Sequence, residues 1–505
     1  MNSKSRTYNV IFNIFTNLGA QIITIIINFL TRIVFIKTFG ENYLGINGLF
    51  SNILSVLSLA ELGINGAMIY SMYKPIAEKD YHKITALMNY YKKLYTYIGL
   101  FVVVLGISLI PFLKYLVNIP SDIGNVTYYY LLYLVNTVVS YFLVYRTSIL
   151  IADQKNYIIK ICNICTVIFQ FLALSYIAYA VKEYYVYLST QIIFLIINNF
   201  ICSNIAVKMY PFIREKAELT KAEKKSIWNN IWAMFSYQVG NVILNNTDNI
   251  LISVIVNTIA VGYYSNYSMI IMSISALIQL IFTSMQASIG NLVVSDDNNR
   301  QYDIFKVIKL MSFWITSFSS VSFAVLLQDC ISLLFSDSYL LDFNIVIVCV
   351  FNFYIVNILY PVYCYRNTVG LFKETKMVMI FTSIVNIILS VILGFAWGLF
   401  GILVSTGIAR ILTNFWYEPV ILYKKYFKKD VKTYFIDQLF YFIGTCGLIT
   451  LSMLIAKPLN TISILPRFLL KICVCIIIPN TCLLALFGRN KECKYLLNMI
   501  KGKVR

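Results

Sequence analysis

The 505-residue chain contains few charged residues and only one histidine, and both shortages restrict what it can do. Its charged fraction of 12% is about half that of a typical soluble domain, which excludes a cytosolic enzyme, a secreted disulfide scaffold and a disordered tail. With His82 as the sole histidine, a histidine proton relay and a histidine metal site are excluded. No P-loop sequence occurs, so the chain carries no ATPase of that kind. We therefore predict a protein that is not an enzyme, with no cofactor and no catalytic residues.

Apolar residues make up 59% of the chain and fall into long runs. A bilayer core about 30 Å thick needs about 20 apolar residues of helix, and fourteen runs between charged clusters reach that length. The chain is therefore predicted to be an all-α polytopic membrane protein. The predicted spans are 9–36, 42–70, 90–116, 125–148, 158–181, 184–207, 228–256, 262–290, 306–328, 343–365, 376–396, 398–422, 435–456 and 463–487.

Positive charge is distributed unevenly between these spans. Lys and Arg total 41 against 22 Asp and Glu, a formal net charge of +19 that in a soluble protein would suggest a nucleic-acid partner. If the N-terminus is cytoplasmic, 33 of the 41 cations lie in cytoplasmic segments and seven on the opposite side, with Arg410 inside a span. The positive-inside rule then predicts that both termini are cytoplasmic. The excess charge faces the anionic lipids of the inner leaflet, and no nucleic acid is predicted as a partner.

A charged segment after the sixth span divides the chain into two similar halves. The Tyr145–Arg146 pair recurs as Tyr365–Arg366 at an offset of 220 residues, and Gly45 recurs as Gly262 at an offset of 217. We interpret these matches as two six-helix lobes that enter the membrane in the same direction, related by an axis along the membrane normal. The predicted parts are an N-lobe at 1–207, a cytoplasmic connector at 208–227, a C-lobe at 228–423, and two further helices with a basic cytoplasmic tail at 424–505.

Polar residues form stripes on the first two predicted helices of each lobe. Such residues are costly in an apolar span, so their helical spacing is informative. Spacings of 4, 7 and 4 residues in the first span, and of 3, 4 and 3 in the seventh, place each set on one helix face. We predict that these helices line a hydrated transport cavity between the lobes; the alternative is that the polar side chains join helices by hydrogen bonds. The stripes are Asn17, Gln21, Asn28 and Arg32 in the first span, and Gln238, Asn241, Asn245 and Asp248 in the seventh.

Four ionised side chains are predicted to lie deep in the membrane, where each costs about 2.5–3.5 kcal/mol on insertion scales. The repeat places Arg32 beside Asp248, so we predict an ion pair between the lobes that forms in one state and breaks in another. Arg146, Arg366 and Glu418 lie nearer the cytoplasmic ends and are interpreted as snorkelling side chains. The four deep residues are Arg32, Glu61, Asp248 and Arg410.

The segment Phe39–Ala86, with LG after the first span, LSLAELGI at the end of the second and the loop KPIAEKD, resembles bacterial polysaccharide-type flippases. These belong to the multidrug/oligosaccharidyl-lipid/polysaccharide flippase superfamily. The resemblance implies a V-shaped pair of six-helix bundles that works by alternating access in the bacterial cytoplasmic membrane. It implies that an undecaprenyl-diphosphate-linked oligosaccharide moves from the inner to the outer leaflet, and it carries the family's cationic cavity over to Arg32 and Arg410. Polymerases and glycosyltransferases of the same pathway are implied as partners.

Three alternatives remain open from the sequence. A drug or cation antiporter of the same fold predicts a more acidic, aromatic cavity. A membrane polymerase or glycosyltransferase predicts a sizeable catalytic loop. A structural or assembly protein would tolerate neutralisation of all four deep charges.

Overall fold

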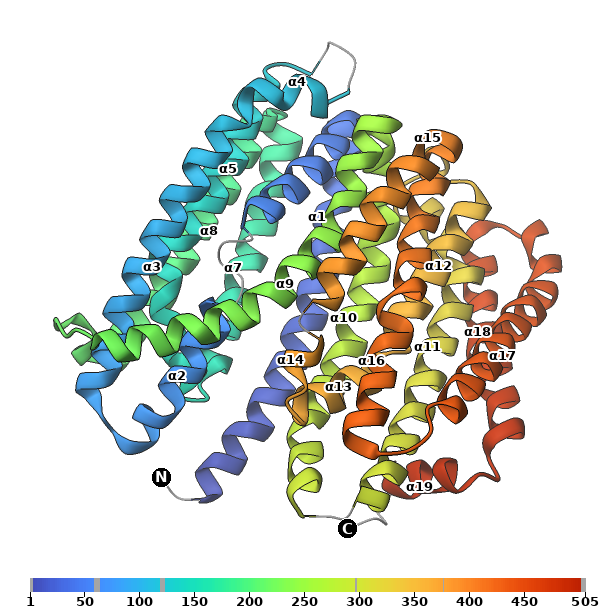
Figure 1. The fold of residues 1–505 in the computed structure, drawn as a ribbon. Coiled ribbons are helices and arrows are strands. Elements are labelled where there is room, and N and C mark those ends of the chain that lie inside the picture. Colours follow the sequence, from blue (N-terminus) through green and yellow to red (C-terminus); the bar gives the residue numbers. More distant parts are fainter. Residues whose placement is uncertain (1–2, 59–63, 119–122, 296–297, 376, 501–505) are drawn as a thin grey trace. The chain divides into compact units, whose positions relative to one another are not determined.

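The computed structural model describes residues 3–58, 64–118, 123–295, 298–375 and 377–500, and the elements assigned in these ranges are all helical (Figure 1). This confirms the predicted all-α fold class. Side chains at some positions within the helices, including most of those before Gly19, are not described. Glu61 lies outside the described residues, as does the side chain of Asn17.

Eleven helices in the described part of the chain are long and apolar enough to cross a membrane. Two of them run through a glycine with non-helical dihedral angles, Gly40 (φ 80°) and Gly398 (φ 58°). Both glycines lie at boundaries that the sequence predicts between two spans, and a positive φ is accessible to glycine without steric strain. The helix Lys221–Ile255 covers the predicted span 228–256 but is not among the eleven. The count of fourteen spans stays a prediction.

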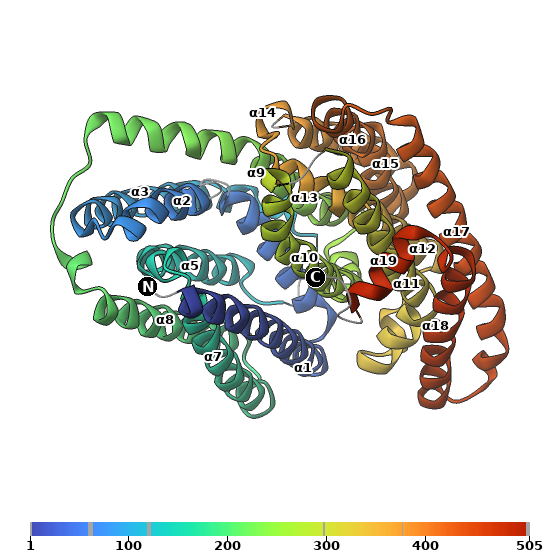
Figure 2. The same cartoon turned by 90° about the horizontal axis from the view of Figure 1, so that it is seen from below.

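Helix contacts divide the chain into two compact units, Met1–Gly262 and Tyr263–Arg505. In the first unit, α1 packs against α7 and α9, α5 packs against α3 and α8, and α7 packs against α8; Figure 2 shows α1, α5, α7 and α8 grouped together. Its elements are α1 (Ser3–Leu57), α2 (Ile64–Glu78), α3 (Tyr81–Ser108), η2 (Ile110–Phe112), α4 (Leu113–Leu116), α5 (Val126–Val144), η3 (Tyr145–Thr147), α6 (Ser148–Ala152), α7 (Asn156–Tyr176), η4 (Ile177–Val181), α8 (Tyr184–Met209), η5 (Pro211–Arg214) and α9 (Lys221–Ile255).

The charged connector predicted at 208–227 is anchored on α3 and turns into a helix before it ends. The hydroxyl of Thr85 donates to the carbonyl oxygen of Phe212 at 3.1 Å, and Lys83 Nζ lies 2.9 Å from Glu223 Oε1. Thr220 caps α9, with reciprocal bonds between Thr220 and Glu223 that form a capping box. Local capping thus starts α9 about seven residues before the predicted span.

Gly45 in α1 packs backbone to backbone against the start of α10 within the first unit. A Cβ atom on Gly45 would lie 2.3 Å from the carbonyl oxygen of Thr258, and one on Gly262 would lie 3.0 Å from the backbone nitrogen of Gly45. Gly45 and Gly262 are also the two glycines that the predicted repeat pairs, and the repeat stays a prediction.

In the second unit, α11 is the central helix, in contact with α12, α17, α18 and α19. The rings of Phe313 and Tyr441 stack there with centroids 4.0 Å apart, inside an apolar cluster formed by α11, α12, α17 and α18. The elements are the main part of α10 (Thr258–Ser295), α11 (Asn298–Leu334), η6 (Asp337–Tyr339), α12 (Phe343–Asn357), α13 (Tyr360–Thr368), α14 (Phe372–Thr375), α15 (Val378–Leu412), α16 (Asn414–Leu422), η7 (Tyr423–Phe427), α17 (Lys432–Ala456), η8 (Lys457–Thr461), α18 (Ile464–Phe487) and α19 (Lys491–Ile500).

Candidate functional site: a polar cavity in the first unit

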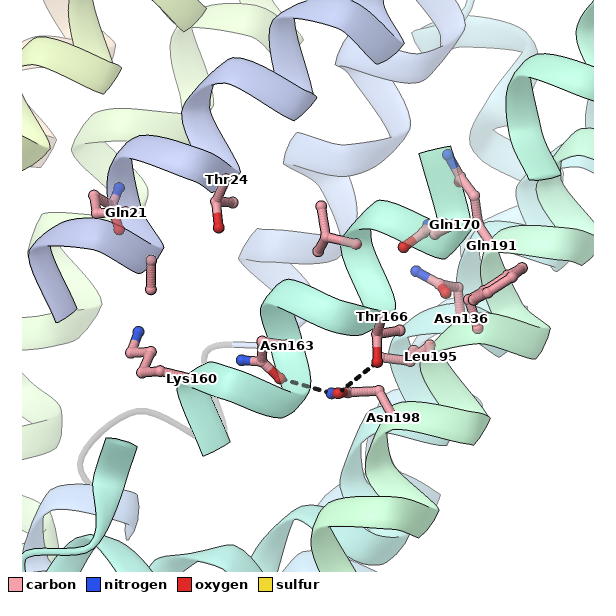
Figure 3. Close-up of a pocket in the computed structure, with 13 residues that line it drawn as sticks. Gln21, Thr24, Asn136, Lys160, Asn163, Thr166, Gln170, Gln191, Leu195 and Asn198 are labelled. Carbon is pink, nitrogen blue, oxygen red and sulfur yellow. Dashed lines mark hydrogen bonds between the residues drawn. The ribbon is translucent and has the colours of Figure 1, made fainter. Parts of the chain in front are cut away.

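A cavity of about 510 Å³ lies among α1, α5, α7 and α8 of the first unit (Figure 3). Its volume falls within the range of about 300–1,000 Å³ usual for small-molecule sites, but those sites are mostly apolar. Here nine of the thirteen lining residues are polar. The nine are Gln21, Thr24, Asn136, Lys160, Asn163, Thr166, Gln170, Gln191 and Asn198.

Helical spacing explains how α7 and α8 present their share of these side chains. Lys160, Asn163 and Gln170 follow one another at intervals of 3 and 7 residues in α7, and Gln191 and Asn198 are 7 residues apart in α8. Intervals of 3, 4 and 7 return to the same helix face. Because α7 packs against α8, the two polar faces converge on the same cavity.

Asn198 ties the two polar faces together. Its Nδ2 donates to Asn163 Oδ1 at 2.9 Å, and its Oδ1 accepts from the hydroxyl of Thr166 at 3.1 Å (Figure 3). Both ends of this amide therefore hold the wall in position. Gln170 and Gln191 project into the same region of the cavity, where their amides can both donate and accept hydrogen bonds.

Lys160 is the charged member of the lining described by the structure. It lies near the start of α7 and, in Figure 3, at the same end of the cavity as Gln21 of α1. Gln21 and Thr24 face α7 and α8 from the opposite wall. The site thus combines a broad neutral hydrogen-bonding surface with one ammonium group at its end, a combination suited to a polyhydroxylated ligand that carries an anion.

Arg32 is linked to this cavity through a tyrosine. The side chain of Gln191, which lines the cavity, hydrogen-bonds with Tyr187, and Arg32 is close enough to Tyr187 and Tyr133 to interact with them electrostatically. The hydroxyls of Tyr133 and Tyr184 are 3.0 Å apart. Arg32 is therefore near a cluster of buried tyrosines and is outside the described lining of the cavity.

The structure places the other polar residues predicted on α1 and α9 outside the described lining of this cavity. Asn28 is exposed on α1, and Gln238 is exposed on α9. Asn245 and Asn241 lie together, because Asn245 Nδ2 donates to the Asn241 carbonyl oxygen at 2.9 Å and to its Oδ1 at 3.1 Å. Gln21 is thus the predicted stripe residue that the described cavity includes.

Two of the predicted deep charges are buried in the protein. Asp248 on α9 is 7% exposed, and Arg410 on α15 is 5% exposed and interacts electrostatically with Tyr360 in the second unit. Burial on this scale requires compensating polar partners. The predicted ion pair between Arg32 and Asp248 stays a prediction.

The snorkelling interpretation of Arg366 and Glu418 is wrong. Arg366 Nη1 lies 2.8 Å from Glu418 Oε2, and the two side chains are 6% and 0% exposed. Arg366 also donates to Asn367 Oδ1 and lies over the ring of Tyr363. Burying an isolated charge inside a protein is costly. Each of these two ions is therefore stabilised by the charge of the other rather than by contact with water.

Sequence reasoning missed the polar faces of α7 and α8. The signal in the sequence is the spacing of Lys160, Asn163 and Gln170 by 3 and 7 residues, on a span outside the first two of each lobe, to which the polar stripes are assigned. The charge count places Lys160 among the cytoplasmic cations, at the start of the predicted span 158–181, and in the structure α7 carries it in the cavity wall.

Comparisons with known proteins agree with this fold. A family model described as "Polysaccharide biosynthesis protein" matches residues 10–286. A comparison with curated protein sequences gives no match. Among solved structures, the lipid II flippase MurJ in an inward closed conformation is similar, with a TM-score of 0.69, 17% sequence identity, and coverage of 94% of this chain and 98% of that chain.

Two transporters of the MATE group are also similar. An inward-facing multidrug resistance MATE family transporter of the MOP superfamily has a TM-score of 0.60 and 12% identity, covering 81% of this chain and 97% of the other. The Vibrio cholerae MATE transporter VcmN, in a mutant form, has a TM-score of 0.57 and 11% identity, covering 84% of this chain and 96% of the other. At these identities the likeness establishes the fold that the chain shares with them.

Proposed function

Because the chain belongs to the polysaccharide biosynthesis protein family, we propose that it is a flippase for undecaprenyl-diphosphate-linked oligosaccharide repeat units. In this proposal the protein moves the lipid-linked sugar from the inner to the outer leaflet of the bacterial cytoplasmic membrane, by alternating access of two lobes. Both termini are then cytoplasmic. The product supplies cell-surface polysaccharide biosynthesis, whose glycosyltransferases and polymerase are the expected pathway partners.

The observation that carries this proposal is the polar, almost uncharged lining of the cavity. Each sugar hydroxyl left without a hydrogen bond in hydrocarbon costs about 4–8 kcal/mol, so an oligosaccharide does not cross a bilayer unaided. Side-chain amides such as Gln170 and Gln191 both donate and accept hydrogen bonds, as hydroxyls do. Such a lining replaces water around a sugar without binding it as tightly as a charged site would.

The diphosphate requires cations, and Lys160 supplies one at the end of the cavity. Cationic donors bind phosphate oxygens by charge-assisted hydrogen bonds. In the predicted orientation Lys160 is near the cytoplasmic surface, at the level where a lipid-linked diphosphate enters from the inner leaflet. The membrane potential then favours export, since moving two negative charges outward gains about 4–5 kcal/mol at 100 mV.

The cavity chemistry favours this proposal over a cation antiporter of the same fold. A cationic drug is attracted by carboxylates and repelled by an ammonium group. The lining that the structure describes contains Lys160 and no carboxylate. An oligosaccharide attached to an anionic diphosphate matches both the neutral and the charged part of that lining.

The direct test is to deplete the protein in cells that make a lipid-linked oligosaccharide and to measure its leaflet distribution with a membrane-impermeant sugar-modifying probe. We expect the inner-leaflet fraction to rise as the protein is lost, and re-expression to restore it. An unchanged distribution, with depletion confirmed by immunoblot, would refute the flippase proposal.

A variant pair tests the role of the cavity. Lys160→Met removes the cavity ammonium, and Lys92→Met removes an exposed lysine of α3 outside the cavity lining. Because hydrogen bonds to charged groups contribute about 1.5–3 kcal/mol, we expect Lys160→Met to lower the flipping rate at subsaturating substrate by about tenfold or more. Lys92→Met should retain the wild-type rate in the same reconstituted vesicles. Equal rates for both variants would exclude Lys160 from the substrate path.

A further inference from the structure

A second cavity, of about 730 Å³, lies in the second unit between α11, α12 and the hairpin formed by α17, η8 and α18. Charged groups line one part of it. Asp329 Oδ1 lies 2.9 Å from Arg467 Nη2, and Asp329 Oδ2 lies 2.7 Å from Lys471 Nζ. Asp329 is 6% exposed and Lys471 is 7% exposed, so this cluster of charges is buried in the protein.

The charges of this cavity do not cancel. Lys457 also lines it, so the described lining has three cations against the single carboxylate of Asp329. Both oxygens of that carboxylate already accept from a cation. Arg467 lies in the first turn of α18, where the partial positive charge of the helix N-terminus adds to its own. The cavity therefore carries an excess of about two positive charges near a low-dielectric region, an arrangement that an anion would stabilise.

Hydrogen-bond donors remain for such an anion. Arg467 uses Nη2 on Asp329 and makes a long contact of 3.4 Å from Nη1 to the Asn460 carbonyl oxygen. Its side chain is 21% exposed and lines the cavity, so the guanidinium group is not fully enclosed by its protein partners. A guanidinium group offers five N–H donors in a planar fork that matches the geometry of phosphate oxygens. Arg467 with Lys457 and Lys471 is thus a donor set typical of phosphate recognition.

Other residues that line the cavity are apolar, and two of them are exposed. Leu454 is 63% exposed and Phe343 is 40% exposed, and Met453 lines the cavity beside them. These residues belong to α12 and α17, which are among the helices long and apolar enough to span a membrane. The cavity lining therefore combines cationic donors with exposed apolar side chains, and a free phosphate or a sugar would make no use of the apolar part.

We propose that this cavity binds the phosphate group of an anionic membrane lipid, with Arg467, Lys471 and Lys457 around the phosphate and an acyl or prenyl chain along Leu454 and Phe343. In the predicted orientation the site opens to the outer leaflet. The proposal is independent of transport, because it concerns a cavity of the second unit and its test measures binding alone.

Native mass spectrometry of the purified full-length protein tests this, with phosphatidylglycerol, undecaprenyl phosphate, zwitterionic phosphatidylcholine or inorganic phosphate added in separate samples. Lys457→Gln removes an exposed cation that forms no ion pair among the described residues, so the fold should persist. Lys114→Gln, which neutralises an exposed lysine of the first unit, is the matched control. We expect Lys457→Gln to lower retention of the anionic lipid about fivefold, the value for one lysine near a lipid surface, and the control to leave it unchanged.

Asp329→Asn tests the sign of the effect. Removing the carboxylate frees Arg467 and Lys471 for the lipid, so a binding site predicts stronger lipid retention. A purely structural cluster predicts no increase in lipid retention. Retention of phosphatidylglycerol or of undecaprenyl phosphate that depends on Lys457 supports the proposal and identifies the lipid source. Equal retention by wild type and Lys457→Gln, equal retention of phosphatidylcholine, or binding of inorganic phosphate alone would overturn it.

Discussion

The buried ion pair of Arg366 and Glu418 lets the energetics of the second unit be tested by a double-mutant cycle. At their separation of 2.8 Å, the Coulomb attraction at an effective dielectric constant of about 20 is about 6 kcal/mol. The desolvation penalty is several kcal/mol for each ion, so the net contribution of the pair is small. Removing one partner leaves the other charge buried with no attraction to offset its desolvation penalty. We therefore expect Glu418→Gln to destabilise the protein by about 3–5 kcal/mol.

Replacing both ions should reverse most of that loss. In Arg366→Met with Glu418→Leu, neither a buried charge nor a buried carboxylate remains, and apolar side chains of similar length fill the space. Such replacements of buried pairs are often neutral or stabilising, so we expect the double variant to lie within about 1 kcal/mol of wild type. The single variant Arg366→Met should be less damaging than Glu418→Gln, because a stranded carboxyl can take up a proton whereas arginine cannot lose one.

The assay is unfolding in mixed micelles as the fraction of sodium dodecyl sulfate is raised, followed by tryptophan fluorescence and circular dichroism. The matched control is Glu78→Gln, which breaks the exposed Lys74–Glu78 pair at 3.8 Å, with side chains 83% and 58% exposed. An exposed pair of this kind contributes at most about 0.5 kcal/mol. A double variant as unstable as Glu418→Gln, or a Glu418→Gln variant no worse than the control, would refute this account of the pair.

Two further predictions concern the first unit. Gly45→Ala should destabilise the protein by about 1–3 kcal/mol or more, since the added Cβ would meet the Thr258 carbonyl oxygen at 2.3 Å. The control Gly19→Ala, with nothing within 4 Å of its Cβ, should be neutral or stabilising by up to about 1 kcal/mol. Thermal unfolding in detergent compares the two variants, and equal midpoints would contradict the close packing at Gly45. The hydrogen bond from Lys83, with those from Thr220, lowers the pKa of Glu223 from 4.5 to about 2, so the anchor of α9 on α3 is fully present above pH 4.5 and is lost as the pH falls through about 2. Hydrogen exchange of residues 214–227 should show this loss of protection, and Glu223→Gln should abolish its pH dependence.

Hydropathy was sufficient to predict the all-helical fold class. Apolar runs of about 20 residues specify membrane helices because the bilayer leaves the backbone few other ways to satisfy its hydrogen bonds. The predicted boundaries between spans coincide with the positive-φ glycines Gly40 and Gly398. The start of α9 was missed because its capping box at Thr220 and Glu223 lies in a segment that composition alone identifies as a loop.

Charged partners could not be predicted in the same way, because they are distant in sequence. Glu418 lies 52 residues from Arg366, and Lys471 lies 142 residues from Asp329. Depth in a span can be read from the sequence, but a partner on another helix cannot. Snorkelling was therefore the default interpretation for Arg366, and it is wrong because the side chain is enclosed by neighbouring helices rather than directed to the surface.

The predicted internal repeat invites a comparison between the polar cavity of the first unit and a packed seam in the second. The fifth and sixth predicted spans, α7 and α8, correspond to the eleventh and twelfth, which form the two arms of α15 on either side of Gly398. In α15 the small residues Ser390 and Ser405 bond directly at 2.5 Å, and a Cβ on Gly401 would lie 1.9 Å from the Leu393 carbonyl oxygen.

Small side chains therefore allow the two arms of α15 to pack closely, and the hydroxyls of these side chains form hydrogen bonds with each other. Asn386 Nδ2 adds a bond of 2.9 Å to the Thr406 hydroxyl in the same seam. In α7 and α8 the longer side chains of Gln170 and Gln191 line a cavity instead. Polar residues in a span therefore have two uses here: those of α15 join its two arms, and those of α7 and α8 line a cavity.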